Sequence, residues 1–262
     1  MEQKHRLTAF IAIFMTFVAA GNAFGQGQFR TISSIGFSYY SDQRYGLDWE
    51  EVFIAPLPSD FYLVAAAKGV NTSFSDQTGG RLGLAFNLPG AYYGEGSYGL
   101  EYDWRDRSFL HTAFLSASYE SDPALASISL TGEFSESSVG GIVSPSLRYA
   151  ILPQLSLNGT LFVAFHYYEP DEHYFNVAVL GSGEYALSSG IFLSLGGTFS
   201  TVYEPTNQHE KWSILSGLTV RPTALISLKS QLEYANAMKA EINPHEIVSI
   251  RLVIDIKFRA RE

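Results

Sequence analysis

Three sets of residues in this sequence have types and spacings that could do chemistry. The first is Gly94, Gly96 and Gly99, which match the GxGxxG pattern of dinucleotide-binding loops. Such a loop needs a buried parallel strand before it and a helix after it. The flanking residues, AYYGEGSYGLEYDW, instead have the aromatic and glycine content of a strand. We therefore interpret these glycines as positions in a curved β-sheet and expect no cofactor.

The second set is His173, His209 and His245, which recur at a constant spacing, each beside a glutamate. Imidazole and carboxylate groups together can bind Zn, Cu or Ni. Neighbouring hairpins of a sheet stand roughly 10 Å apart, because adjacent strands are about 4.8 Å apart. One ion cannot bridge two of these histidines unless their loops fold inward. We expect solvated loop residues and no metal site.

The third set is His166 with the serine and acidic residues near it in the sequence. A hydrolase needs a nucleophile or an acid pair beside a histidine. The sequence has no HExxH, P-loop or GxSxG pattern that would mark such a site. An enzyme is therefore the last of the function hypotheses, and we expect no catalytic residue.

The N-terminus has the features of an export signal. The basic residues Lys4 and Arg6 precede the apolar run Leu7–Ala20, and small residues follow up to Gly25. This order is that of a secretory signal peptide, and the apolar run is shorter than the about 20 residues of a membrane-spanning helix. We assign residues 1–25 to the signal peptide and residues 26–262 to the exported domain.

The composition limits the classes of structure and function. The net charge is −9, and an acidic exported protein is a poor nucleic-acid binder, because phosphate contacts need a positive surface. The absence of cysteine excludes disulfides and thiolate metal sites. Aromatic residues make up 15% of the chain, and charged residues only 16%, against the usual 25% or so. Such an exported chain is one large β structure or a membrane barrel.

Alternation of apolar and polar residues is the dominant pattern from Leu155 onward. In the stretch ISLKSQLEY, Ile226, Leu228 and Leu232 share one face of an extended chain, because successive strand side chains point to opposite faces. The same pattern begins at Leu155, Phe175, Ile191, Trp212 and Val248. Earlier strands are expected at 29–40, 80–88, 93–104, 108–119, 124–135 and 141–151.

Residues 41–79 allow two interpretations. Asp48–Leu57 and Phe61–Gly69 could be a pair of strands that turns at Leu57–Asp60. Alternatively, Pro58–Asp60 caps a short helix, FYLVAAAKG, that ends at Gly69. The first interpretation predicts an all-β, antiparallel up-and-down transmembrane barrel of fourteen strands, and the second predicts twelve. Both numbers are even, as a single-chain outer-membrane barrel requires. We favour fourteen.

Connections and aromatic residues distinguish a membrane barrel from a soluble one. Short turns at 152–154, 187–190 and 221–224 alternate with longer acidic loops at 169–173, 204–210 and 235–245. Short turns at one end and long loops at the other are typical of outer-membrane barrels, as are aromatic girdles at both interfaces. The aromatic residues at the strand ends are Tyr149, Tyr185 and Phe258 beside short turns, and Tyr167, Tyr168, Tyr174, Tyr203, Trp212 and Tyr234 beside long loops.

With these features the exported chain resembles the porin-type outer-membrane β-barrels of Gram-negative bacteria. The resemblance is one of strand pattern and covers residues 26–262. It implies a location in the cell outer membrane, contact with outer-membrane lipid, and folding by the barrel-assembly machinery. The alternation from Ile250 to Phe258 fits the C-terminal signal that this machinery reads.

We expect a passive channel for small polar solutes or ions. Opposed charges across a pore would constrict it and create a transverse field. The residues predicted to face the lumen are Glu184, Arg221, Lys229, Gln231, Glu233, Arg251, Asp255 and Lys257. The acidic residues predicted to attract cations from the outer loops are Glu169, Asp171, Glu172, Glu204, Glu210 and Glu246. The alternatives are a non-conducting barrel for surface display, adhesion or a structural role, and an enzyme at the rim.

Overall fold

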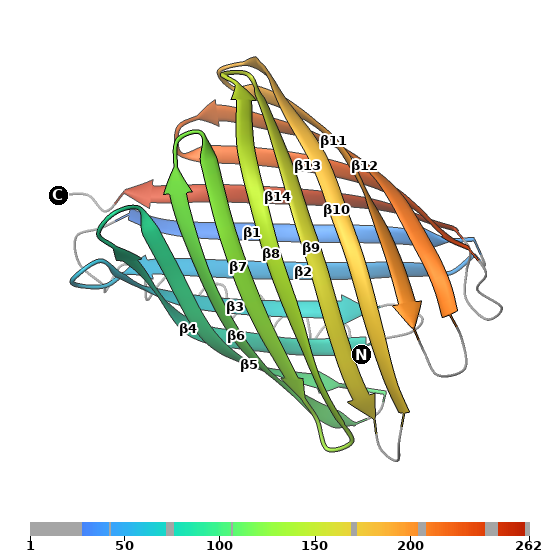
Figure 1. Ribbon diagram of the computed structural model, residues 1–262. Helices are drawn as coiled ribbons and strands as arrows, with labels where there is room; N and C mark the ends of the chain where they lie inside the picture. Colours follow the sequence, from blue (N-terminus) through green and yellow to red (C-terminus); the bar gives the residue numbers. More distant parts are fainter. Residues whose placement is uncertain are drawn as a thin grey trace, which may run out of the picture.

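The computed structural model describes residues 28–41, 43–71, 76–105, 107–168, 172–203, 208–238 and 246–259. Within these ranges the chain forms a closed barrel of fourteen strands, each hydrogen-bonded to its neighbours in the sequence (Figure 1). No helix in the described ranges is long and apolar enough to cross a membrane. The predicted signal peptide, residues 1–25, lies outside them.

All neighbouring strands are antiparallel, and β1 pairs with β14 to close the barrel, which confirms the predicted fold class. The strands are β1 (Gln28–Tyr40), β2 (Tyr45–Pro56), β3 (Phe61–Asn71), β4 (Asp76–Leu88), β5 (Tyr92–Asp103), β6 (Ser108–Ser121), β7 (Ala124–Phe134), β8 (Ser138–Leu152), β9 (Leu155–Tyr168), β10 (Glu172–Ser188), β11 (Ile191–Tyr203), β12 (Gln208–Thr223), β13 (Ile226–Met238) and β14 (Glu246–Arg259).

Each strand has an apolar outer face and a lumen face. On β14, Ile250 and Leu252 are each 50% exposed on the outside. Arg251 lies on the opposite face and forms an ion pair with Asp48 of β2 inside the barrel. Large apolar side chains that stay exposed around a closed barrel suit lipid rather than water, and the closed ladder leaves no unpaired strand edge in the membrane.

The stretch ISLKSQLEY forms most of β13 and follows the same rule. Leu228 and Leu232 are exposed on the outer surface. Gln231 and Glu233 pair in register with Arg251 and Ser249 of β14, on the lumen face. Its apolar side therefore faces lipid.

The region that the sequence left open consists of β2 and β3, which pair from Leu47 with Asn71 to Pro56 with Tyr62. Their lumen faces are apolar near the short turn, where Val52, Val64 and Ala66 pack together in a small buried cluster. Because both faces of this segment carry apolar residues, the period of two disappears and the run looks helical. The fourteen-strand interpretation is correct.

The connections at the outer end are shorter than predicted. β10 begins at Glu172, β12 begins at Gln208, and β13 continues to Met238, so these strands include much of the predicted loops. Polar residues do not stop a barrel strand, because the hydrogen-bonded ladder can continue beyond the lipid. Of the acidic residues predicted in outer loops, Glu172, Glu210 and Glu246 belong to strand ends, whereas Glu169, Asp171 and Glu204 lie outside the described residues.

Aromatic side chains stand on the outer surface near both ends of the strands. Tyr149 and Tyr185 are exposed beside the short turns, and Tyr167 is exposed at the other end. Tyr174 was expected in the outer girdle and instead lies in the lumen, where its ring stacks on His166 at 4.8 Å between centroids. Because β10 already begins at Glu172, alternation gives the outward position to Phe175.

Candidate functional site

Charged side chains cover the lumen face of β14 and β1 to β5, and we call this set the charged wall. The antiparallel register places residues of opposite sign on neighbouring or next-but-one strands, where they attract each other. The charged wall consists of Arg30, Asp48, Glu50, Lys68, Arg81, Glu95, Glu101, Arg251 and Asp255.

Two ion pairs join the strands at the barrel closure. Arg30 donates from Nε and Nη2 to the two carboxylate oxygens of Asp255, at 2.9 and 2.8 Å. Arg251 Nη2 donates to Asp48 Oδ2 at 2.6 Å, across β1. Gly36 stands between these two in register, and a Cβ there would collide with the Asp48 carboxylate. Charge-assisted, partly bidentate bonds of this kind are stronger than neutral ones.

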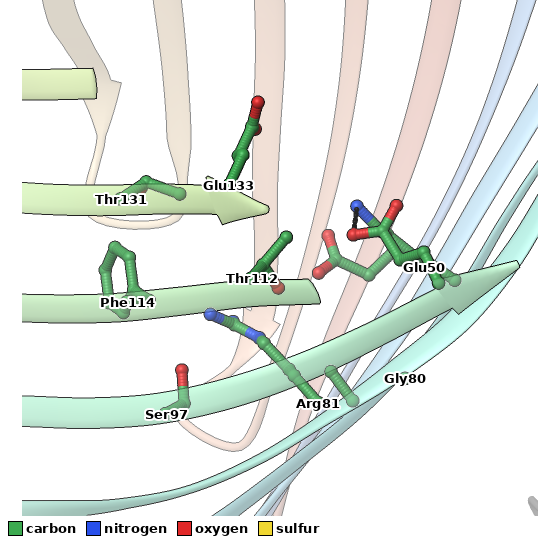
Figure 2. Close-up of a pocket in the computed structure, with 11 residues that line it drawn as sticks. Glu50, Gly80, Arg81, Ser97, Thr112, Phe114, Thr131 and Glu133 are labelled. Carbon is green, nitrogen blue, oxygen red and sulfur yellow. Dashed lines mark ion pairs between the residues drawn. The ribbon is translucent and has the colours of Figure 1, made fainter. Parts of the chain in front are cut away.

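Two further ion pairs lie at a cavity of about 240 Å³ in the charged wall, and Figure 2 shows the residues that line this cavity. Lys68 Nζ lies 2.6 Å from Glu101 Oε1, and Arg81 Nη1 lies 3.6 Å from Glu95 Oε1. Residues of β6 and β7 complete the cavity. Its lining includes Glu50, Lys68, Arg81, Ser97, Phe114 and Glu133.

The lumen beyond this cavity holds His166, the histidine that the sequence singled out. His166 Nδ1 lies 3.7 Å from Glu133 Oε2, and its ring stacks on Tyr174. A Cβ on Gly140 would collide with this ring, so the glycine of β8 makes room for it. The histidine is thus held by side chains of β7 and β10. No group of three histidine, aspartate or glutamate side chains in the described ranges could hold a metal ion.

A second part of the lumen, on β7 to β12, carries many hydroxyl groups, and we call this set the hydroxyl wall. Ser127 and Ser146 share a hydrogen bond of 2.5 Å, as do Thr198 and Ser213. The hydroxyl wall consists of Ser127, Ser129, Ser144, Ser146, Thr160, Ser182, Thr198, Ser200 and Ser213.

The residues predicted to face the lumen lie on several strands. Arg251 and Asp255 of β14 join the charged wall. Glu184 accepts a bond of 3.1 Å from Arg148 Nη2, and the Arg221 guanidinium lies 4.3 Å from the centre of the Phe192 ring. The remaining four follow the lumen register of β13 and β14: Lys229, Gln231, Glu233 and Lys257.

These contacts differ from the predicted opposition of charges across a pore. The ion pairs join neighbouring or next-but-one strands, so each paired charge is balanced by a partner on the same part of the barrel wall. The sequence prediction missed the partners on β1 to β5, because the alternation of apolar and polar residues weakens towards the N-terminus. A usable signal was present in β5, where Glu95, Ser97, Glu101 and Asp103 share one face.

No protein-family model and no curated protein matches the sequence. Similar solved structures are outer-membrane proteins. An outer-membrane channel from Pseudomonas putida F1 aligns with a TM-score of 0.59 and 11% identity, over 89% of this chain and 96% of that one. An anion-selective porin from Comamonas acidovorans gives 0.55 and 8%, over 89% and 99%. OmpT of Vibrio cholerae with loop L8 deleted gives 0.57 and 8%, over 88% and 99%. The chain has the fold of the porin-type outer-membrane β-barrels of Gram-negative bacteria.

Proposed function

We propose that the protein is a passive channel for small polar solutes and ions in the outer membrane, exported by residues 1–25 and folded by the barrel-assembly machinery. The observation that supports this is a lumen covered by charged and hydroxyl side chains inside an apolar outer surface. Barrels of eight strands are filled by side chains, and those of 16–18 strands leave an aqueous channel. A fourteen-strand barrel with a polar lumen falls towards the second class.

The lumen chemistry suits passage rather than tight retention. Paired charges leave little net field, and hydroxyl groups can replace part of the hydration shell of a solute. Conduction requires such contacts to be favourable enough for entry and weak enough for exit. The acidic residues near the outer mouth, including Glu172, Glu210 and Glu246, add a modest preference for cations at low salt.

Single-channel recording tests the proposal. The mature protein is refolded in detergent, checked for a heat-dependent shift in gel mobility, and added to a planar bilayer. We expect discrete conductance steps that grow with salt concentration, and a reversal potential of the sign of weak cation selectivity. Folded barrels that insert without conducting would favour a non-conducting display or structural barrel. A refolded protein that stays in the aqueous phase would refute the membrane location as well.

A further inference from the structure

We propose that the charged wall contains a binding subsite for a neutral, polyhydroxylated solute the size of a monosaccharide. The subsite is the cavity lined by β2 to β7 (Figure 2). This inference rests on the proposed channel function, because the solute reaches the cavity through the lumen. It specifies the class of solute that the channel retains in passing.

Unused hydrogen-bonding groups are concentrated at this cavity. Five buried side-chain atoms of the described residues have no hydrogen-bond partner. Two of them, Arg81 Nε and Ser97 Oγ, belong to residues that line the cavity, and a third, Glu95 Oε1, lies beside Arg81. The 3.6 Å between Arg81 Nη1 and Glu95 Oε1 is an ion-pair contact too long for a hydrogen bond. A buried donor or acceptor without a partner is costly to the folded state. A ligand that bonds to Arg81 Nε and Ser97 Oγ would remove that cost for these two groups.

The groups available at the cavity match hydroxyls better than ions. Arg81 Nε is a donor, the carboxylate of Glu50 is an acceptor, and the hydroxyl of Ser97 can do both. Thr112 and Thr131 add two more hydroxyls to the lining. Each hydroxyl of a polyol both donates and accepts, so one molecule can satisfy this mixed set. An ion of either sign would leave the donors or the acceptors unmatched.

Most of the charged side chains that line the cavity already have partners. Lys68 is bound to Glu101 at 2.6 Å, and Glu133 faces His166 at 3.7 Å. A charged solute would have to compete with these contacts, whereas a neutral solute can bind beside them. The electrostatics therefore favour a ligand without net charge.

The shape of the cavity provides room for one small ring. Its volume of about 240 Å³ lies below the about 300–1,000 Å³ of pockets for drug-sized ligands. Gly99 faces Arg81 in register, and a Cβ there would collide with the Thr112 hydroxyl. Glycine at this position therefore keeps this side of the cavity open. The ring of Phe114 offers an apolar surface to the C–H face of a sugar.

Binding requires a small movement of Arg81. Its guanidinium carbon lies 5.6 Å from the centre of the Phe114 ring, near the about 6 Å limit of a cation–π contact. The Arg81 side chain is 32% exposed, so it can rotate towards the lumen. Figure 2 shows Arg81, Ser97 and Phe114 extending from adjacent strands towards the same space. Rotation of Arg81 uncovers Ser97 and the ring face together.

The test measures binding of D-glucose to the refolded full barrel by isothermal titration calorimetry, and the current through single channels as D-glucose is added. We expect saturable binding with a Kd on the order of 1–10 mM, and a saturable fall in current over the same range. Ser97→Ala should weaken binding about fivefold, and Arg81→Lys, which keeps the charge beside Glu95, about tenfold. Ser144→Ala in the hydroxyl wall is the matched control and should bind as the wild type does.

Three results would overturn the subsite. They are no saturable heat with D-glucose, an equal loss of affinity in Ser144→Ala and Ser97→Ala, or saturation by glycine or Mg²⁺ but not by D-glucose. Calorimetry does not need a conducting pore, and conductance without sugar does not need the subsite. Failure of the subsite and failure of the channel are therefore distinguishable. Heat-dependent gel mobility of each variant confirms that it has folded.

Discussion

The charged wall and the hydroxyl wall make the same lumen polar in two different ways. In the charged wall, formal charges depend on partners from other strands, as Arg30 depends on Asp255 and Lys68 on Glu101. In the hydroxyl wall, groups such as Ser129 and Ser144 are neutral and face each other in register. A lost charge leaves an uncompensated partner, whereas a lost hydroxyl leaves a methyl group. The charged wall should therefore depend on its exact residues, and the hydroxyl wall should tolerate change.

Both walls must face the lumen for this difference to hold. The substitution with the largest expected effect on stability tests that assignment of faces. Leu252→Arg places a charge in lipid and should lower the free energy of unfolding by about 2–4 kcal/mol or prevent assembly. Ser249→Arg, on the lumen face of the same strand, should have little effect. Urea unfolding of the protein refolded in lipid vesicles provides the measurement. Similar losses in both variants would mean that the faces are assigned wrongly.

Removing one side chain of a bonded pair in each wall tests how strongly the stability of the barrel depends on that pair. Asp255→Ala leaves the Arg30 guanidinium without its bidentate partner at the barrel closure, and should lower the free energy of unfolding by about 2 kcal/mol. Ser146→Ala removes one hydrogen bond to Ser127 and should cost about 0.5–1 kcal/mol. The same vesicle unfolding assay compares them. A larger loss for Ser146→Ala would reverse the comparison.

The two walls also differ on their outer surfaces. Outside the hydroxyl wall, residues such as Leu161 and Leu195 are large and apolar, whereas Glu51 of β2 shares the outer face of Leu47, opposite Ser33 of β1. Glu51 is only 8% exposed and its Oε1 has no hydrogen-bond partner, which is costly for a buried carboxylate. Glu51→Leu should therefore raise the free energy of unfolding by about 1 kcal/mol. Destabilisation by Glu51→Leu would instead mean that the carboxylate makes a stabilising contact there.

A new charge in the hydroxyl wall should change ion selectivity slightly, whereas a substitution that keeps a paired charge in the charged wall should not. Ser144→Lys puts an unpartnered charge in the hydroxyl wall. A unit charge about 10 Å from a passing ion contributes about 0.4 kcal/mol in water, or about a twofold shift in the permeability ratio towards anions. Lys68→Arg keeps the pair with Glu101 and should shift nothing. Reversal potentials across a salt gradient compare the two variants. An equal shift of the permeability ratio in both would mean that paired charges also affect ion selectivity.

The sequence predicted the strands and their faces best in β9 to β14, where apolar and polar residues alternate regularly. From Leu155 onward one face of every strand is apolar and the other polar, so the faces of β9 to β14 follow from a period of two. In β2 and β3 both faces carry apolar residues, such as Val64 inside and Ala65 outside, and the period is lost. The strand count there depended on pairing with β1 and β4, which the sequence alone does not display.

The sequence identified some residues of the candidate site but not the residues with which they pair. Arg251 and Asp255 could be assigned to the lumen, but their partners, Asp48 and Arg30, are more than 200 residues away in the sequence. Closure of β1 against β14 sets which residues meet, and no local pattern encodes that register. The cavity beside Arg81 likewise needs six strands in place before it exists.

The most direct test of the account is the swelling of liposomes that contain the refolded barrel, in a size series of neutral solutes from arabinose to raffinose. If the protein is a passive channel, swelling is faster than in protein-free liposomes and slows steadily as the solute becomes larger, because solutes pass through a polar lumen. Swelling at the protein-free rate for every solute, with the barrel correctly folded in the membrane, would contradict it.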